Sequence, residues 1–199
     1  KGPTVELPGI EFNSGKPNSL QSSGEKKWNS GDYKGALEDF DKLIKEEPNN
    51  AYAFFSRGSA LLKLGKLQEA MDDTNKALEL NPNIAKAYET RGVAKVMLGN
   101  QGGALLDFRR AIEIDENFSS AYANLGALKS DLGNYKGALI DLNKALEIDP
   151  NLAYGYRLRA KNYDRQGNMT DACKDMKKAS SLGDEVATRN LEMNPGVCK

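Results

Sequence analysis

Three kinds of residue recur every 34 positions along most of this chain. Glycine, alanine and aspartate each occupy one column of five positions. The columns are Gly31, Gly65, Gly99, Gly133 and Gly167; Ala36, Ala70, Ala104, Ala138 and Ala172; and Asp39, Asp73, Asp107, Asp141 and Asp175. A fixed period of about 20–50 residues is the signature of a repeat architecture. The chain is therefore predicted to be a stack of similar units.

Each unit has the pattern of two amphipathic helices around a short turn. Residues 119–152 show it best, because their small and apolar residues recur at three- and four-residue intervals. A glycine can end the first helix in the left-handed conformation, and an alanine lets the second helix approach the first closely. Neither helix could bury its apolar stripe alone, so each pair needs neighbours. The sequence therefore predicts an all-α fold.

The predicted organisation has three parts. Residues 1–16 are rich in proline and glycine and are expected to form an extended N-terminal arm. The arm could pack on the first helix pair or a neighbouring molecule, or lie in a groove of its own or a neighbouring chain. Five units follow over residues 17–186. Their bounds are 17–50, 51–84, 85–118, 119–152 and 153–186, and residues 187–199 are expected to supply a capping helix and tail that cover the last pair.

The composition excludes several classes of function. The chain has no histidine, so Ser-His-Asp and Cys-His catalysis and HExxH zinc helices are excluded. With 28 basic and 28 acidic residues, it has no net charge that would attract nucleic acid or an anionic membrane. Its apolar runs are too short to span a bilayer. We expect no enzymatic activity, no cofactor and no metal site.

The two cysteines, Cys173 and Cys198, form no CxxC pair and cannot by themselves hold a zinc ion. They could pair if the tail folded back in an oxidising compartment. We expect instead two free thiols, with Cys173 as a small core side chain. This expectation favours a reducing compartment, either the cytoplasm or an organelle matrix or stroma. The chain begins at Lys1 rather than Met, as a processed form or an expressed fragment would, so a targeting segment could have been removed.

The aspartate column could suggest a metal or catalytic site. Aspartates one repeat apart in a stack are too far apart to share an ion, however. Arg57, Arg91 and Arg159 recur at one position of the first helices. We therefore expect Arg–Asp ion pairs that stabilise the stacking of the units.

The repeats resemble the tetratricopeptide repeat family, whose pattern is small and apolar residues in the first helix, then alanine, a bulky residue, alanine and proline. In residues 119–152 the matching residues are Tyr122, Leu125, Gly126, Ala138, Leu142, Ala145 and Pro150. The chain departs from the pattern at Thr74, where a bulky residue is usual, and at Glu116, where proline is usual. The resemblance covers residues 17–186 and implies a right-handed α-solenoid of five helix-turn-helix repeats.

The resemblance also implies that the first helices line a concave groove for a partner peptide or segment. The predicted partner-binding residues are Tyr52, Phe55, Lys86, Glu89, Val93, Met97, Asn124, Tyr154, Arg157, Lys161 and Arg165. They predict an apolar patch in the first half and a basic end formed by Arg157, Lys161 and Arg165. This pattern would suit a peptide with hydrophobic anchors and an acidic group. The alternative that these side chains pack on the arm or on neighbouring helices stays open.

One partner class in the family is not expected here. Some members hold the C-terminal carboxylate of heat-shock chaperones with lysine, asparagine and arginine side chains of successive repeats. The corresponding residues are Gln21, Glu25, Ser56, Lys86 and Thr90, and a frame one repeat later gives Phe55, Ser59, Thr90, Ser120 and Asn124. Neither set rebuilds the clamp. The predicted function is a non-catalytic adaptor or assembly factor, with a fixed structural subunit or a self-associating scaffold as the alternative.

Overall fold

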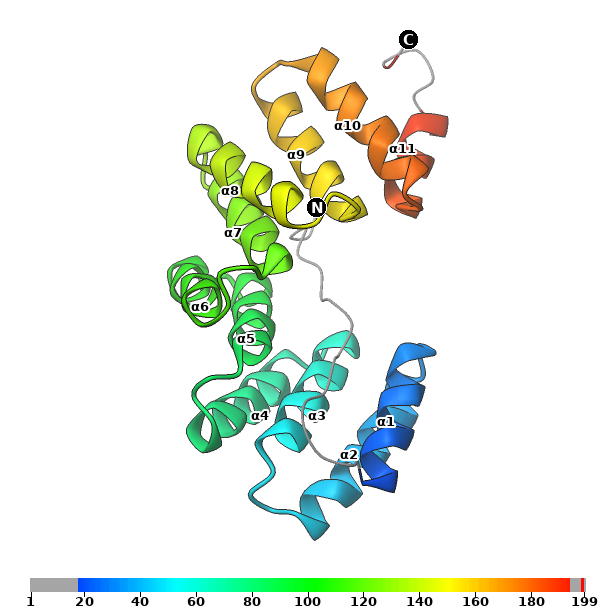
Figure 1. Ribbon diagram of the computed structural model, residues 1–199, viewed down its shortest axis with the longest axis vertical. Helices are drawn as coiled ribbons and strands as arrows, with labels where there is room; N and C mark the ends of the chain where they lie inside the picture. The colour runs from blue at the N-terminus through cyan, green and yellow to red at the C-terminus, as the bar shows by residue number, and fades with distance from the viewer. Residues whose placement is uncertain (1–17, 194–197, 199) are drawn as a thin grey trace. The chain divides into compact units, whose positions relative to one another are not determined.

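The computed structural model describes residues 18–193 and residue 198 of the 199-residue chain. The predicted arm, residues 1–16, lies outside the described residues, as do residues 194–197 of the predicted tail. The described chain is all-α and contains no strand (Figure 1), so the predicted fold class is confirmed. Its helices are α1 Ser19–Asn29, α2 Tyr33–Glu46, α3 Ala51–Lys63, α4 Leu67–Leu80, α5 Ala85–Met97, α6 Gln101–Ile114, α7 Ser119–Asp131, α8 Tyr135–Ile148, α9 Ala153–Arg165, α10 Met169–Ser181 and α11 Glu185–Met193.

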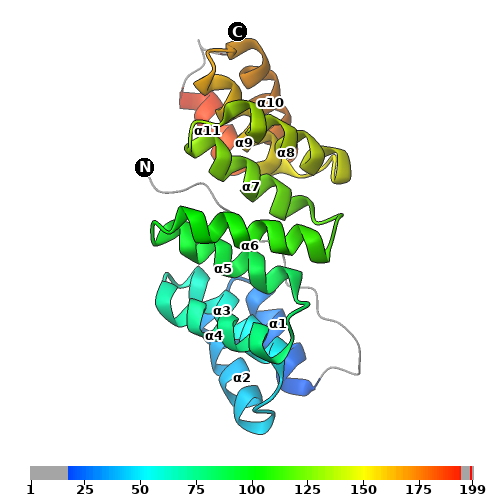
Figure 2. The same ribbon diagram turned by 90° about the vertical axis from the view of Figure 1, so that its left-hand side faces the viewer.

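The described residues divide into two compact units. Residues 18–114 form the N-terminal unit, with α1 to α6, and residues 115–193 with residue 198 form the C-terminal unit, with α7 to α11. In each unit successive helices pair, α1 with α2, α3 with α4, α5 with α6, α7 with α8, and α9 with α10 (Figures 1 and 2). Within a unit the second helix of one pair also packs on the first helix that follows, as α2 does on α3 and α8 on α9. Each unit is therefore a stack of helix-turn-helix repeats.

The glycine column ends the first helix of every pair, as predicted. All five glycines have a positive φ, from 75° at Gly167 to 83° at Gly31, a conformation that strains any residue with a Cβ. The next residue then caps the second helix in several pairs. For example, Oδ1 of Asn134 accepts a hydrogen bond from the Gly137 backbone N–H at 3.0 Å. The glycine thus defines every turn, and a side-chain cap adds a second local signal in several of them.

Close approach of the two helices in a pair depends on a second set of small residues. A Cβ on Gly92 of α5 would lie 2.6 Å from Cε1 of Phe108 on α6, well inside van der Waals contact. In the C-terminal unit a Cβ on Gly126 would lie 2.7 Å from Cγ of Leu142. Phe108 and Leu142 are both fully buried. The missing Cβ therefore makes the space that the bulky residue of the second helix fills.

Each unit has its own apolar core. In the N-terminal unit a cluster that includes Trp28, Phe40 and Phe55 joins the first two pairs. In the C-terminal unit Leu142 and Leu158 belong to a cluster between the α7–α8 pair and α9. The helix α11 packs on α10 and begins directly after Asp184. The burial of two separate cores leaves the rest of each helix available for polar contacts.

Candidate functional site

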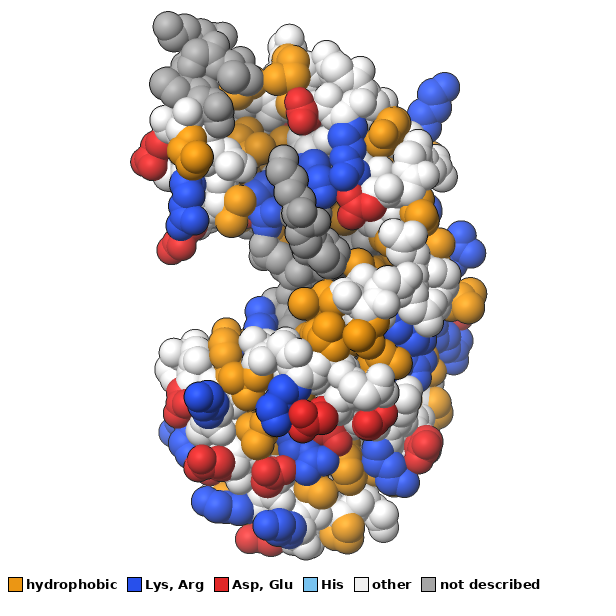
Figure 3. Space-filling view, turned by 180° about the vertical axis from the view of Figure 1, so that it is seen from behind, with side chains coloured by type: hydrophobic (Ala, Val, Ile, Leu, Met, Phe, Trp, Pro, Cys, Tyr) orange, Lys and Arg blue, Asp and Glu red, His pale blue; other side chains and the backbone are white. Residues whose placement is uncertain are grey.

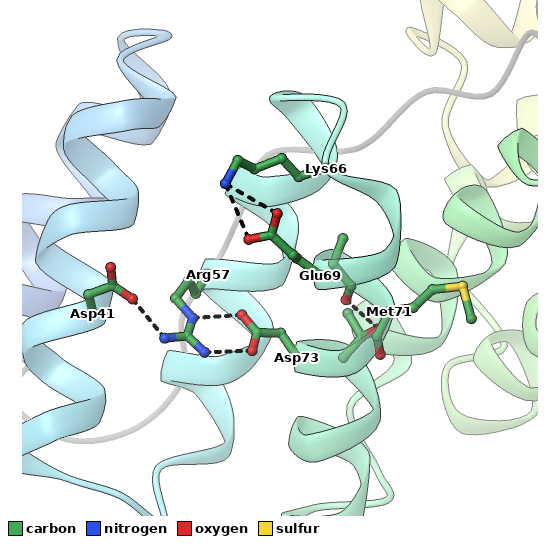
Figure 4. A network of polar contacts seen from close by, with 8 residues as sticks. Asp41, Arg57, Lys66, Glu69, Met71 and Asp73 are labelled. Carbon is green, nitrogen blue, oxygen red and sulfur yellow. Dashed lines mark hydrogen bonds and ion pairs between the residues drawn. The ribbon is translucent and has the colours of Figure 1, made fainter.

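The aspartate column is buried, and three of its five members pair with arginine. Arg57 of α3 donates from Nε to Oδ2 and from Nη2 to Oδ1 of Asp73 on α4, at 2.7 Å in both cases. Its third nitrogen, Nη1, donates to Oδ1 of Asp41 on α2 at 2.7 Å. Figure 4 shows Arg57 lying between these two carboxylates, with the exposed pair Lys66–Glu69 nearby. One guanidinium thus connects α3 both to α4, its partner in the pair, and to α2 of the preceding pair.

The same bridge recurs once more in each unit. Arg91 donates from Nε and Nη2 to Asp107 at 2.9 and 2.7 Å, and from Nη1 to Oδ1 of Asn75 at 2.7 Å. In the C-terminal unit Arg159 binds Asp175 through two nitrogens at 2.6 and 2.8 Å, and Nη1 donates to Oδ1 of Asn143 at 2.7 Å. The predicted Arg–Asp pairing is therefore confirmed, and it acts both within and between pairs.

Where the arginine is absent, a lysine one turn later takes its place. Ser23 stands at that position in α1, and there Lys27 binds Oδ2 of Asp39 at 2.7 Å while the Ser23 hydroxyl donates to the same oxygen at 2.6 Å. Leu125 stands there in α7, and Lys129 forms the ion pair with Asp141. Every aspartate of the column therefore has a cation beside it.

These contacts shift the pKa values of Asp39 and Arg57 in the directions that keep both side chains charged. Burial alone would raise the pKa of the Asp39 carboxyl, but the hydrogen bonds from Lys27 and Ser23 hold that pKa below its ordinary value. Hydrogen bonds to Asp73 raise the pKa of the Arg57 guanidinium above its ordinary value. The aspartate column is thus a set of charged structural contacts. Within the described residues, no three His, Cys, Asp or Glu side chains are grouped so as to hold a metal ion.

The predicted partner-binding residues of the N-terminal unit differ widely in accessibility. Phe55 is only 2% exposed and belongs to the core cluster, so here the alternative of packing on neighbouring helices applies. Glu89 and Val93 of α5 are also buried. Tyr52 and Lys86 are half-buried, and Met97 is 46% exposed. The expected apolar patch is therefore reduced to Met97 with part of Tyr52.

The predicted residues of the C-terminal unit are largely engaged with acidic neighbours. Arg157 is buried and donates from Nε to Oδ2 of Asp184 at 2.7 Å. On the same helix Lys161 and Arg165 both contact Oδ1 of Asp131, at 3.1 and 2.7 Å. Asn124 is fully buried and Tyr154 half-buried. The three cations expected to form a basic end are thus paired with two carboxylates, which leaves little free positive charge there.

The expectation of two free thiols is wrong. Cys173 of α10 and Cys198 form a disulfide, with their Cα atoms 5.2 Å apart. Cys173 is half-buried and is not the small core side chain that its place next to the alanine column suggested. The error has a simple physical source, since 25 residues separate the two cysteines and only the tertiary fold brings them together.

Charge on the surface differs between the second helices. On the face of the N-terminal unit that Figure 3 shows, acidic and basic side chains are interspersed. On α10, by contrast, Lys174, Lys177 and Lys178 line one pocket. The sequence patterns described above do not single out this group. The repeat columns carry part of the signal, because Lys174 follows acidic or apolar residues in its column and Lys178, basic in every pair, has Ser181 where three earlier pairs have glutamate.

The family model of the tetratricopeptide repeat matches residues 51–84 and 119–152, which hold the α3–α4 and α7–α8 pairs. Both segments are tetratricopeptide repeats. The described helices, paired as above, are consistent with about five such repeats. Tetratricopeptide repeats form a protein-interaction scaffold that is typically non-catalytic, so the expected partners are proteins or peptides.

Several solved structures share this tetratricopeptide-repeat fold. MamA is 27% identical over 83% of this chain and 96% of its own, with a TM-score of 0.65. TTC0263, a thermophilic tetratricopeptide-repeat protein of Thermus thermophilus, is 20% identical over 87% of this chain and 96% of its own, with a TM-score of 0.78. YrrB, described as having an unusual peptide-binding site, is 22% identical over 85% of this chain and 88% of its own, with a TM-score of 0.61. The last two likenesses show the fold alone.

No curated protein sequence shows significant similarity to this tetratricopeptide-repeat chain. In the part of the chain that the structure describes, no helix is long and apolar enough to cross a bilayer.

Proposed function

We propose that the protein is a non-catalytic adaptor or assembly factor that binds a segment of a partner protein along α5, a first helix of its N-terminal unit. The observation that carries this proposal is the exposure of Met97 and Leu98, 46% and 49%, at the end of that helix. Adjacent large apolar side chains left in solvent are typical of an interaction site. A partner side chain that covered them would gain the free energy of apolar burial.

The same stripe of α5 suggests what the partner segment carries. Lys86 lies eleven residues before Met97, which is slightly more than three helical turns, so both lie on one face about 16 Å apart. An extended segment of about five residues spans that distance. We expect its apolar anchor to meet Met97 and its acidic group to meet Lys86. Peptide binding is described for YrrB, but the proposal for this chain depends on its own residues.

A second candidate function is that of a fixed structural subunit or self-associating scaffold. It is favoured by Leu106 on α6, which is 67% exposed, and by Ile140 on α8, which is 70% exposed. Both lie on second helices and therefore point to a contact made elsewhere than on the first helices. Light scattering of the purified protein distinguishes a self-associating scaffold from an adaptor. A stable oligomer would support the scaffold, and a monomer would support the adaptor.

The adaptor proposal is tested by exchanging exposed residues, so that the core is not disturbed. The variant Met97→Ser/Leu98→Ser should reduce recovery of the partner about tenfold in quantitative affinity purification with crosslinking from the native source. Leu106→Ser is the matched control, since it removes a more exposed leucine from a second helix of the same unit. Loss of the partner with Leu106→Ser alone would support the structural candidate. An unchanged partner profile for Met97→Ser/Leu98→Ser would overturn the adaptor proposal.

A further inference from the structure

A basic pocket lies on the C-terminal unit, at the last helix pair. It has a volume of about 590 Å³ and is formed by α9 and α10. Its lining residues are Tyr156, Arg159, Lys174, Asp175, Lys177, Lys178 and Ser181. Four cations thus surround a single carboxylate.

That carboxylate does not neutralise the lysines. Asp175 is almost fully buried and accepts hydrogen bonds from Nε and Nη2 of Arg159 at 2.6 and 2.8 Å. The same guanidinium lies over the ring of Tyr156, 5.5 Å from its centroid, so its position is fixed from a second side. The charges of Arg159 and Asp175 therefore cancel, and the positive charges of the three lysines remain uncompensated within the pocket.

Comparison with the earlier pairs shows that Lys178 has lost a counter-charge. The equivalent cation of each of three earlier second helices binds a glutamate three residues later. These pairs are Lys76–Glu79 at 3.1 Å, Arg110–Glu113 at 2.9 Å and Lys144–Glu147 at 3.0 Å. On α10 the residue at the glutamate position is Ser181. The cation–glutamate pair of these three second helices therefore cannot form on α10, because serine replaces the glutamate.

The other two lysines also replace acidic or accepting residues. At the position of Lys177, three earlier helices carry Asp41, Asn75 or Asn143, whose side chains accept a hydrogen bond from an arginine of the next pair. At the position of Lys174, the first two pairs carry Glu38 and Asp72, and the next two carry the apolar residues Leu106 and Ile140. Both exchanges move the surface of α10 toward positive charge.

Helix energetics alone do not explain these exchanges. Lys174 is followed by like charges three and four residues later, a spacing at which repulsion destabilises a helix. The helix dipole favours Lys178 in the last turn, but Lys174 lies in the second turn of α10, where the dipole gives no such benefit. All three lysines are exposed, and none forms an ion pair with another residue in the described ranges 18–193 and 198. The charge is therefore available to a ligand.

We propose that the pocket lined by Lys174, Lys177 and Lys178 is a docking site for an acidic segment of a partner protein. The lysines lie within about one helical turn of one another, so two or three carboxylates of one short segment can meet them together. The ring of Tyr156 forms a wall beside which the aliphatic part of such side chains can lie. A nucleic acid fits less well, because the chain as a whole has no net charge.

Fluorescence anisotropy with the full chain and a labelled peptide containing six consecutive glutamates tests the proposal. At low salt we expect saturable binding, which weakens as NaCl rises because the contacts are exposed charges. The variant Lys174→Gln/Lys177→Gln/Lys178→Gln should weaken binding about tenfold, as expected for three exposed charge contacts. Its circular-dichroism melting curve should match that of the unmodified protein, since all three side chains are exposed.

The control variant is Lys34→Gln/Lys76→Gln/Lys136→Gln, which makes the same change in net charge at exposed lysines of other second helices. It should bind the peptide within about twofold of the unmodified protein. Equal losses in both triple variants would show a response to net charge alone and would overturn the proposal, as would no binding by the unmodified protein. Binding of a phosphoserine peptide without binding of the glutamate peptide would overturn the assignment to carboxylates. Met97→Ser/Leu98→Ser should leave glutamate-peptide binding unchanged, which separates this site from the adaptor surface.

Discussion

Arg157 of α9 donates a hydrogen bond from Nε to Oδ2 of Asp184 at 2.7 Å, with only 8% and 6% of the two side chains exposed. The other oxygen of Asp184, Oδ1, accepts from the backbone N–H of Ala187 at 2.8 Å. One carboxylate thus receives the guanidinium of α9 and caps the start of α11. Arg157 was expected to contact a ligand because of its position on α9. In this structure it instead connects α9 to the start of α11.

Replacing Arg157 by alanine should lower the free energy of unfolding by about 3–5 kcal/mol, because it leaves the Asp184 carboxylate buried without this partner. Urea denaturation followed by circular dichroism measures the change. Arg165→Ala is the control on the same helix, and since its pair with Asp131 is partly exposed we expect a loss below about 1 kcal/mol. Similar losses in the two variants would contradict a structural role for the buried pair.

The bridge made by Arg57 should be worth more than an ordinary surface ion pair. Arg57→Ala removes hydrogen bonds to Asp73 and Asp41, and we expect a loss of about 2–3 kcal/mol in unfolding free energy. Lys66→Ala breaks the neighbouring pair with Glu69, whose side chains are both exposed, and should change the stability by no more than about 0.5 kcal/mol. Arg57→Lys should recover only part of the loss, since an ammonium cannot form the two-nitrogen fork.

Two glycines of the same pair should respond to alanine in opposite directions. Gly92→Ala would place a Cβ 2.6 Å from Phe108, and the resulting overpacking should lower the unfolding free energy by about 1–3 kcal/mol. Gly102 in α6 has no atom within 4 Å of an added Cβ, so Gly102→Ala should raise it by up to about 1 kcal/mol through helix propensity. Thermal melts of the two variants provide the measurement. Destabilisation by both would mean that the close approach at Gly92 is not the cause.

The disulfide predicts a dependence on redox conditions. It closes a segment of 25 residues between α10 and the chain end, so Cys198→Ser should lower the unfolding free energy by about 2–4 kcal/mol. A reductant should lower the melting temperature of the unmodified protein to that of the variant and leave the variant unchanged. A reductant effect of the same size on Cys198→Ser would show that the disulfide is not its target.

Acid should weaken the contact between Lys27 and Asp39. Because the folded-state pKa of Asp39 lies below its ordinary value of 3.8, the stabilisation is present above that value and is lost as the pH falls through the folded pKa. The difference in unfolding free energy between the unmodified protein and Asp39→Asn should therefore be largest near neutral pH and shrink below about pH 4. Urea titrations at several pH values measure it, and a difference that stayed constant or grew in acid would contradict this assignment.

Local patterns were enough to predict most of the fold. The glycine that ends a helix, the alanine that permits close packing and the arginine sixteen residues before each of three aspartates all act over one or two turns or across one pair. Gly31, Ala36 and the Arg57–Asp73 pair therefore lie where the 34-residue period places them. The period also made Lys174 and Lys177 recognisable in principle, because no other second helix has lysine at either position.

Accessibility could not be predicted in the same way. Phe55 and Met97 both follow the helical phase expected of a binding face, yet one is buried in the core and the other stands in solvent. The pairing of Arg157 with Asp184 and of Cys173 with Cys198 joins residues 27 and 25 positions apart that belong to no repeating column pair. The helix pairs, their turns and the repeated ion pairs were predictable from the residues alone, because they depend on short-range spacing. Which charges are neutralised and which side chains reach solvent became clear only from the packed helices, because burial depends on what every neighbouring helix covers.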